Sequence, residues 1–195
     1  MTGGGFVSGD KVGVSAHIDN FDPLKYFDRK EARRMDRYCQ FALAAAREAV
    51  AQAEGLMDAY APERVGTIIG SGVGGLETIE NEYKKLLLQG GPGRVSPLFI
   101  PMMIANMAAG HVSMAFGSKG ASYCVTTACA SGTHAIGEAF RAIKHGYLDA
   151  CIAGGTEAPI TSIARASACT VVSAGVAPGA DPARIRTRFP PEPNG

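Results

Sequence analysis

The sequence of 195 residues has little net charge and no long apolar run. Its formal net charge is +1, so overall charge gives no reason to expect nucleic acid or a membrane surface as a partner. No stretch of about 18 apolar residues occurs, so we expect no membrane span. The opening residues, MTGGGFVSGDK, contain no basic region followed by an apolar run, so we expect no secretory signal there.

Paired cysteine motifs are also missing. The chain has five cysteines, an odd number, and none stands in a C-x-x-C pair. This pattern argues against a disulfide framework and against a zinc site. We therefore predict no metal and no cofactor, and we expect a reducing cytoplasmic location.

A helix with two distinct faces is predicted in the first third of the chain. Asp28 is suited to be its N-cap, and Glu31, three residues later, completes a capping box. An apolar stripe then recurs at helical spacing through Met35, Cys39, Ala42, Ala46, Val50 and Ala53. A basic stripe on another face consists of Lys30, Arg33, Arg34 and Arg37. Such a charge run ordinarily marks a solvated helix face.

Short apolar runs alternate with helical segments in the rest of the chain. Buried strands are predicted at Val65–Gly70, at about residues 123–128 and at about residues 150–153. Helices are predicted at about residues 76–88, in a methionine-rich segment after Pro101, and from near Cys129 to near Gly146. The alternation favours an α/β layered fold with a largely parallel sheet.

Cys129 stands where a predicted strand gives way to a predicted helix, in the stretch VTTACASGTHAIG. The unpaired N–H groups and the dipole at a helix start favour the thiolate form of a thiol placed there. Small neighbours, Ala128, Ala130 and Gly132, allow a sharp turn and the close approach of a ligand. The backbone N–H of Cys129 is a candidate donor to the oxyanion of a thioester substrate. The alternative is that Cys129 is a small buried hydrophobe, as most free cysteines are.

The stretch TTACASGTHAIGEAFRAIKHG, followed by DACIAGGTEAPIT, resembles the active-site region of the β-ketoacyl-[acyl-carrier-protein] synthases, and most closely their synthase II branch. The segments DRKEARRMDRYCQFAL, IGSGVGGLETIENEY and SPLFIPMMIANMAAGH agree with this family in order and spacing. The resemblance covers about residues 11–161. It implies a thiolase-like layered fold (α-β-α), N-terminal half only, with a mixed and largely parallel sheet and a central buried helix.

On this resemblance we expect residues 1–10 to be unstructured or outside the family, residues 11–174 to be a partial synthase domain, and residues 175–195 to be a divergent tail. The implied activity is fatty-acid elongation in an intimate homodimer. Acyl carrier protein passes an acyl group to Cys129, and malonyl-loaded carrier then loses carbon dioxide and condenses with it. Two histidines, a lysine and a second oxyanion donor of the family belong to its C-terminal half, so we expect this chain alone to be deficient in condensation.

The resemblance also assigns binding positions. Val73, in the turn GSGVGGL, matches a residue that gates the acyl pocket, while Phe99 and Ile104 match positions that line the pocket of the neighbouring subunit. Ordinary core packing is the alternative for all three residues. Complementary charge would steer the acidic carrier protein to four matching basic residues, Lys30, Arg33, Arg34 and Arg94.

The other reactive residues are interpreted as structural. His134 lies five residues past Cys129, about 140° around a helix, so the two side chains should diverge. His134 is interpreted as a structural or interface residue. Glu157, in GGTEA, is interpreted as a hydrogen-bonded structural residue, and Cys39 and Cys151 as core residues. Other functions stay open: a non-catalytic truncated chain that keeps only dimerisation or the binding of an acyl group or carrier, a polyketide-type ketosynthase, or an unrelated thiol hydrolase.

Overall fold

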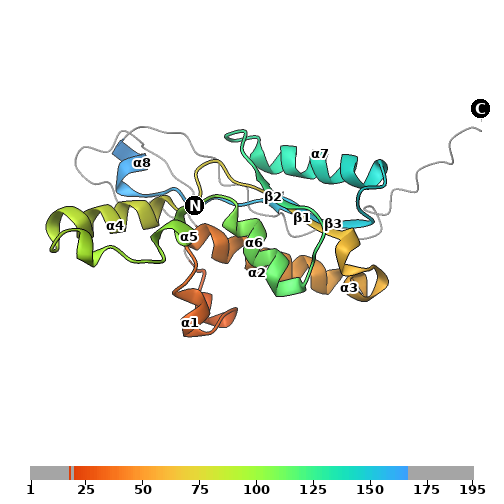
Figure 1. Cartoon of the computed structure of the whole chain (residues 1–195), viewed down its shortest axis with the longest axis horizontal. Helices are drawn as coiled ribbons and strands as arrows, with labels where there is room; N and C mark the ends of the chain where they lie inside the picture. Colours follow the sequence, from red (N-terminus) through yellow and green to blue (C-terminus); the bar gives the residue numbers. More distant parts are fainter. Residues whose placement is uncertain (1–17, 19, 167–195) are drawn as a thin grey trace, which may run out of the picture.

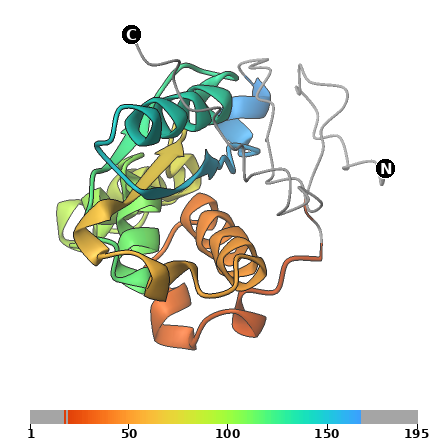
Figure 2. The same ribbon diagram turned by 90° about the vertical axis from the view of Figure 1, so that its right-hand side faces the viewer.

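The chain folds into three layers, a helix above a sheet and two helices below it (Figure 1). The computed structural model describes residue 18 and residues 20–166. Figure 2 shows α7 (Ser131–Lys144) on one face of the sheet, with α2 (Arg37–Gln52) and α6 (Met107–Phe116) on the other. The predicted N-terminal segment 1–10 and the tail 175–195 lie outside the described residues.

The sheet contains three parallel strands in the order β2-β1-β3. The central strand, β1 (Val65–Gly70), is buried along its whole length, as the apolar run predicted. β3 (Ala150–Gly155) lies on one side and β2 (Ser122–Val125) on the other. Gly70 pairs with Val125 and with Gly155, so the carboxyl ends of all three strands meet at one edge. The predicted α/β layered fold with parallel pairing is confirmed.

The second strand differs from its prediction in length and burial. β2 ends at Val125 instead of about residue 128, and the side chain of Tyr123 is exposed. Within the described residues β2 pairs only with β1, so its other edge is open. The prediction of a buried strand there is wrong because an apolar, β-branched sequence does not show whether a second neighbour covers it.

The first predicted helix is two helices. Asp28 caps α1 (Arg29–Ala32) and accepts a 2.8 Å hydrogen bond from the Glu31 N–H, which confirms the predicted N-cap. The helix then breaks at residues 33–36, and Asp36 becomes the N-cap of α2 with an extended backbone. The prediction of one continuous helix is wrong because the Asp36 carboxylate also bonds Thr78, which holds Asp36 outside the helical conformation.

The other elements connect these layers. α4 (Leu76–Leu88) has its predicted bounds, whereas the methionine-rich segment forms two helices, α5 (Phe99–Met103) and α6. α7 begins at Ser131, two residues later than predicted, and ends at His145 as its C-cap. The short elements are α3 (Leu56–Ala59), α8 (Ser162–Ala166), and the 3-10 turns η1 (Pro23–Lys25), η2 (Pro62–Arg64) and η3 (Pro92–Arg94).

The apolar core lies mainly between the sheet and the pair α2 and α6, where Tyr38, Cys39 and Val112 are fully buried. Cys39 is thus a core residue as predicted, and burial raises the pKa of its thiol to about 12. A smaller cluster under α7 contains Ile68 and Ala135.

α7 carries exposed apolar side chains on the face turned away from the sheet. On the outer face of α7, Ile136 is 57% exposed and Phe140 is 48% exposed. The sheet lies on the opposite side of the helix. No helix in the described part of the chain combines the length and the apolar character that crossing a bilayer requires.

Candidate active site

Three loops converge where the parallel strands end. The loop after β1 begins with Ser71, whose N–H donates to the Val125 carbonyl of β2 at 3.2 Å. The loop after β3 begins with Thr156, whose N–H donates to the Gly70 carbonyl at 2.9 Å. The loop after β2 carries Cys129. The carboxyl edge of an open parallel sheet is the usual place for a ligand site, so the loops at this edge form the candidate site.

The Cys129 side chain is exposed in a tight turn just before α7. Within the described residues Ala128 is the only non-glycine residue with a positive φ, at 48°. The turn is closed by hydrogen bonds from the Ala130 N–H to the Thr127 carbonyl at 3.0 Å and from the Ser131 N–H to the Ala128 carbonyl at 3.1 Å. The left-handed residue turns the chain sharply before the thiol, and the alternative of a buried, hydrophobic Cys129 is contradicted.

Ser131 holds this turn from inside the protein. Its buried hydroxyl accepts from the Thr127 N–H at 2.9 Å and donates to the Ala128 carbonyl at 2.6 Å. Thr127 is held a second time, because its Oγ1 lies 3.2 Å from Nδ1 of His134. His134 also pairs with Glu138 at 3.6 Å. His134 therefore supports the turn, in agreement with its interpretation as a structural residue.

Glycines let α7 approach the sheet directly below Cys129. A Cβ on Gly70 would lie 2.2 Å from the Ser131 carbonyl oxygen. A Cβ on Gly155 would lie 2.7 Å from the Cα of Gly132. The first turn of α7 therefore rests on the ends of β1 and β3 with no side chain between them, which fixes the position of the thiol relative to the sheet.

The loop after β1 is wrapped around the carboxylate of Glu157. Oε2 accepts hydrogen bonds from the N–H groups of Gly72 at 2.5 Å and Val73 at 3.2 Å, and Oε1 accepts from the Ser71 hydroxyl at 3.3 Å. Burial raises the pKa of this carboxyl, and the backbone hydrogen bonds act in the opposite direction. The geometry agrees with a structural role for Glu157, and none of these partners is a reacting group.

The same loop lies against the Cys129 turn. A Cβ on Gly72 would lie 3.7 Å from the Cα and carbonyl oxygen of Ala128, and the Thr126 hydroxyl donates to the Ser71 carbonyl at 2.9 Å. Val73 is 41% exposed, so it is not an ordinary core valine. The structure thus brings the predicted gate loop and the predicted nucleophile loop together.

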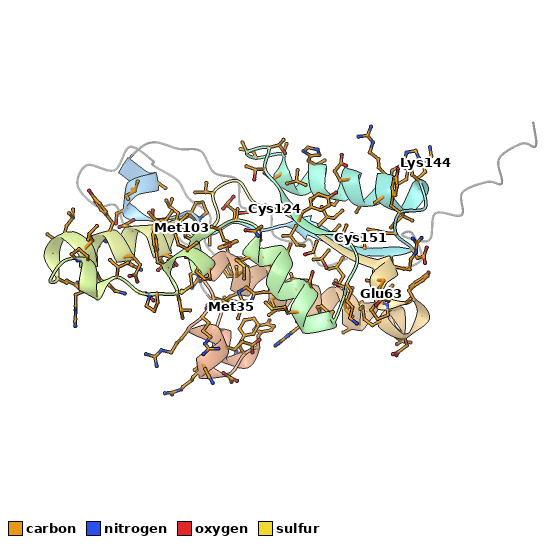
Figure 3. The ribbon with its side chains drawn as sticks, in the orientation of Figure 1. Met35, Glu63, Met103, Cys124, Lys144 and Cys151 are labelled. Atoms are coloured by element: carbon orange, nitrogen blue, oxygen red, sulfur yellow. The ribbon has the colours of Figure 1, made fainter. Side chains whose placement is uncertain are left out.

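Phe99 and Ile104 are only partly buried, at the two ends of α5. The Ile104 carbonyl accepts a 2.5 Å hydrogen bond from the hydroxyl of Tyr38, and Gly75 donates to the neighbouring Met103 carbonyl at 2.9 Å. The residue range 102–105 therefore packs on the glycine-rich loop, with Met103 labelled in Figure 3. Phe99 belongs to the far end of α5, and a role for it in an acyl pocket stays a prediction.

The four predicted carrier contacts are exposed. Lys30 lies in α1 and Arg33 and Arg34 follow it, whereas Arg94 ends η3. In both ribbon views α1 lies on the side of the molecule opposite α7. These basic side chains are therefore open to solvent, as both a solvated helix face and a carrier-docking surface require.

The two cysteines in the sheet, Cys124 and Cys151, are partly shielded from solvent. Burial raises the pKa of the Cys124 thiol on β2, and it raises the pKa of the Cys151 thiol on β3 to about 11. Figure 3 shows both side chains at the level of the sheet, below α7. Cys151 is partly buried and packs against the small cluster below α7, so its prediction as a core residue holds in that sense.

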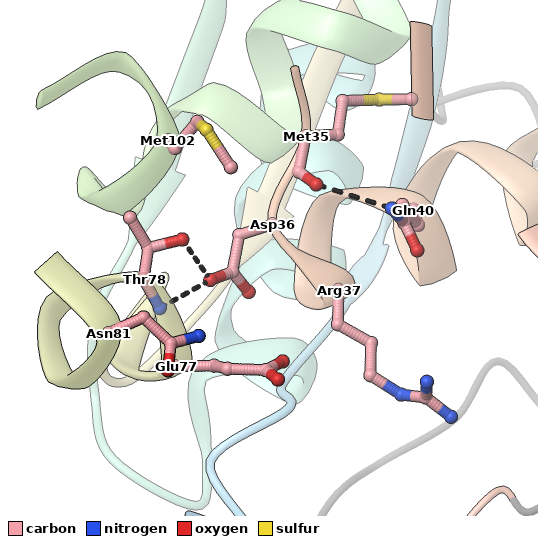
Figure 4. A pocket seen from close by; sticks show the side chains of 8 residues that line it. All are labelled: Met35, Asp36, Arg37, Gln40, Glu77, Thr78, Asn81 and Met102. Carbon is pink, nitrogen blue, oxygen red and sulfur yellow. Dashed lines mark hydrogen bonds between the residues drawn. The ribbon is translucent and has the colours of Figure 1, made fainter. Parts of the chain in front are cut away.

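A separate hollow of about 210 Å³ lies between the beginnings of α2 and α4 (Figure 4). At its centre the Asp36 carboxylate accepts hydrogen bonds from the Thr78 N–H at 3.0 Å and from its hydroxyl at 2.6 Å. Arg37 and Glu77 stand at its rim. Its lining contains none of the predicted site residues, so this hollow is distinct from the candidate site.

The sequence did not predict the support that Ser131 gives to the turn, nor the partners of Glu157. Ser131 was quoted only as part of the nucleophile stretch, although a hydroxyl in the first turn of a helix is a common partner of nearby backbone groups. The interpretation of Glu157 as a hydrogen-bonded structural residue named no partners, since they lie 84, 85 and 86 positions away in the sequence. No local pattern reports a contact of that separation.

Comparisons with known proteins agree with this geometry. The family model described as the N-terminal domain of β-ketoacyl synthases matches residues 3–175. A 3-oxoacyl-[acyl-carrier-protein] synthase 2 of Staphylococcus aureus is 50% identical over 153 residues, which are 78% of this chain and 38% of that protein. The synthase 2 of Synechocystis is 46% identical over 76% of this chain and 36% of that protein. The chain thus spans less than half the length of these curated relatives.

Solved structures give the same result for the fold. A ketosynthase structure, described as a type II polyketide acyl-carrier protein in complex with its ketosynthase bound to the hexaketide, matches with a TM-score of 0.70 at 26% identity, over 75% of this chain and 42% of that one. A β-ketoacyl synthase from Burkholderia phymatum matches with a TM-score of 0.55 at 30% identity, over 67% of this chain and 32% of that one. The chain therefore belongs to the β-ketoacyl synthase family, within its N-terminal domain.

Proposed function

We propose that this chain supplies the acyl-accepting cysteine of a 3-oxoacyl-[acyl-carrier-protein] synthase that elongates fatty acids. The observation that carries the proposal is the exposed thiol of Cys129, held in a strained turn at the start of α7 and beside the glycine-rich loop. A small, exposed and rigidly placed nucleophile at the edge of a sheet is what an acyl-transfer site requires.

In the first half of the reaction, Sγ of Cys129 attacks the carbonyl carbon of the acyl thioester on the carrier. The carbonyl oxygen becomes an oxyanion, for which the Cys129 N–H is our proposed donor. The bond between the acyl carbon and the carrier sulfur then breaks, and the carrier leaves as a thiol. The acyl group is now a thioester of Cys129.

In the second half, a malonyl thioester loses carbon dioxide, and the resulting carbanion attacks the Cys129 thioester. A carbon–carbon bond forms, the Cys129 thiolate is released, and the product is a 3-oxoacyl thioester. His134 is engaged with Thr127 and Glu138, so we do not assign it to the decarboxylation. We propose that this step needs residues from the part of the family's enzymes that this chain does not match. The match covers 38% of the Staphylococcus aureus relative.

The proposed partner is acyl carrier protein, in its acyl-loaded and malonyl-loaded forms. The exposed basic residues Lys30, Arg33 and Arg34 would attract an acidic carrier, and one similar solved structure is a ketosynthase in complex with its carrier. We also propose a homodimer, since the open edge of β2 and the exposed face of α7 are surfaces that a second chain could cover. A reducing cytoplasm would keep the Cys129 thiol reduced, as acyl transfer requires.

A polyketide-type ketosynthase is the second candidate, because solved polyketide ketosynthases share the fold. Their identity to this chain is 26%, compared with 50% for the fatty-acid synthase 2 of Staphylococcus aureus. The higher identity supports fatty-acid elongation.

The test is to incubate the chain with an acyl-loaded carrier protein and to measure the intact mass with time. A stable adduct together with a 3-oxoacyl product after malonyl-carrier is added supports the full synthase. An adduct without condensation supports a chain that performs only the first half-reaction. Turnover of the thioester to free acid without an adduct would support a thiol hydrolase and would contradict the proposal.

A further inference from the structure

We propose that Glu157 is a positioning residue that fixes the glycine-rich loop over Cys129 and thereby sets which acyl chains reach the thiol. The substrate in this inference, an acyl thioester, comes from the proposed function. Its physical basis is the set of contacts that residues 71–74 make. Glu157 accepts hydrogen bonds from Ser71, Gly72 and Val73, so it can act through the loop.

The backbone at Glu157 is anchored by the residue that precedes it. The preceding residue, Thr156, donates through its N–H to the Gly70 carbonyl at 2.9 Å and through its hydroxyl to the Tyr38 carbonyl at 2.6 Å. Both Thr156 and Glu157 are buried. The carboxylate therefore projects from a point that is tied to β1 and to α2, and it has little freedom to move.

The glycine-rich loop is held at its two ends by Val125, Thr126 and Met103, and between them by that carboxylate. Gly72 and Val73 donate their N–H groups to Oε2, and the Ser71 hydroxyl donates to Oε1. The same hydroxyl accepts from the Gly74 N–H at 3.1 Å, so all four residues of the loop are linked to Glu157 directly or through Ser71. Gly72 and Gly74 have few backbone restraints of their own, so the loop would sample many conformations without these bonds. A Cβ on Gly72 would also lie 3.0 Å from Oε2, so there is little room for a side chain there.

The loop in turn touches the turn of the nucleophile. Gly72 approaches Ala128, the residue before Cys129, and the Ser71 carbonyl accepts from Thr126. Val73 is 41% exposed, so core packing does not determine where its side chain lies. The position of Val73, next to Gly72 in this loop, therefore follows from its backbone, and its backbone is bonded to Glu157.

A misplaced apolar side chain beside a nucleophile changes which substrates fit, and a difference of one methylene group already alters rates about ten-fold. Removing the Glu157 carboxylate should therefore change the selectivity of Cys129 for short and long acyl chains. Glutamine keeps an oxygen for Gly72 and Val73, and its amide can donate to the Ser71 hydroxyl, so Glu157→Gln should preserve the loop.

The experiment measures the rate of acylation of Cys129 in the 195-residue chain by hexanoyl-pantetheine and by hexadecanoyl-pantetheine, with the adduct located by peptide mass mapping. Amide hydrogen exchange of residues 71–74 is followed in the same samples. Glu157→Ala should change the ratio of the two rates by about five-fold and speed exchange in this loop, while Glu157→Gln stays within about two-fold of the unmodified chain.

The matched control is Asp149→Ala. Asp149 accepts two hydrogen bonds from Arg64, at 2.7 and 3.0 Å, and so joins β1 and β3 at the end of the sheet away from Cys129. This variant should lower stability and leave the ratio of rates unchanged. If Glu157→Ala does not fold, Glu157→Asp, whose carboxylate is one methylene shorter, must show the change in ratio instead.

The inference is overturned if the ratio and the exchange of residues 71–74 are unchanged in the folded Glu157 variants, or if Asp149→Ala changes the ratio equally. If the unmodified chain forms no adduct with either thioester, the proposed function fails. The exchange of residues 71–74 then still decides whether Glu157 fixes the loop, and unchanged exchange in Glu157→Ala would reject that as well.

Discussion

The hydroxyl of Ser131 donates a 2.6 Å hydrogen bond to the carbonyl of Ala128, across the turn that leads to Cys129. The same hydroxyl accepts from the Thr127 N–H, so one buried atom joins both sides of the turn. The turn is strained at Ala128 and would relax if this link were lost. The placement of the thiol therefore depends on a residue that does not itself react.

We predict that Ser131→Ala lowers the free energy of unfolding by about 2 kcal/mol, because it leaves the Thr127 N–H without its partner. The rate of alkylation of Cys129 by iodoacetamide should change in the same variant, since the turn relaxes. Ser122→Ala is the control: its exposed hydroxyl bonds only Ser113 among the contacts described, and its loss should leave both quantities nearly unchanged. Equal behaviour of the two variants would contradict the role of Ser131.

The positive φ of Ala128 predicts an unusual response to glycine. An alanine to glycine change at an exposed helical position such as Ala49 in α2 should lower stability by about 1 kcal/mol. At Ala128 the relief of left-handed strain should offset most of this loss, so Ala128→Gly should be close to neutral in a urea titration. A loss as large as that of Ala49→Gly would show that Ala128 is not strained.

The contact between α7 and the sheet predicts opposite effects for two glycines. Gly70→Ala places a methyl group 2.2 Å from the Ser131 carbonyl oxygen, and we expect it to destabilise the chain by about 3 kcal/mol and to displace Cys129. Gly137 lies in α7, and a new Cβ there would meet no described atom within 4 Å beyond the adjoining residues and backbone of its own helix, so Gly137→Ala should stabilise the chain by up to about 1 kcal/mol. Thermal unfolding measures both, and a mild effect at Gly70 would argue against the close packing.

The elements that the sequence predicted well are those with strong local patterns. The N-cap Asp28, the buried strand β1 and the helix α4 follow from capping chemistry, β-branched residues and periodicity, and the structure has all three. The break at Asp36 was missed because the apolar stripe of Met35 and Cys39 continues in phase across it. An aspartate followed by helix formers was the available signal.

In the candidate site, too, the sequence predicted the features that have a local pattern and did not predict those that depend on distant contacts. The strand-to-helix position of Cys129 was visible in local sequence, although the helix begins two residues later. The clamp formed by Glu157 was not visible, because a hydrogen bond from Gly72 joins residues that are distant in the chain. The open edge of β2 was not visible either, since a strand sequence does not state how many neighbours it has.

Stability should depend on pH through Glu157. Burial raises the pKa of its carboxyl above the ordinary value of 4.5, so the folded chain binds this proton more tightly than the unfolded chain. Its contribution to stability is therefore full below pH 4.5 and is lost as the pH rises through the folded pKa. Glu157→Gln removes this dependence.

The check is a series of urea unfolding curves from acidic to neutral pH. The stability of Glu157→Gln relative to the unmodified chain should increase as the pH rises through this window. The opposite slope would mean that the backbone N–H groups of Gly72 and Val73 outweigh burial and that the pKa is lowered.

If the basic residues dock the carrier protein, reversing their charge should slow acyl transfer from the carrier protein and not from a free pantetheine thioester. Reversing charge with Arg33→Glu and Arg34→Glu together should slow acyl transfer from carrier protein about ten-fold at low salt, and less at high salt. Acylation by a free pantetheine thioester should be unaffected. Lys144→Glu, on α7 at the opposite side of the molecule, is the control and should change neither rate. Equal slowing of both substrates would exclude a docking role.

The central claim is that Cys129 is the acyl acceptor of this chain. The most direct measurement is to locate and time acyl adducts from acyl-loaded carrier protein on each cysteine of the chain by peptide mass mapping. The account predicts one adduct, on Cys129, that disappears in Cys129→Ala and persists in Cys124→Ala. An adduct that forms first on Cys124 or Cys151, or a folded chain in which Cys129→Ala changes nothing, would contradict it.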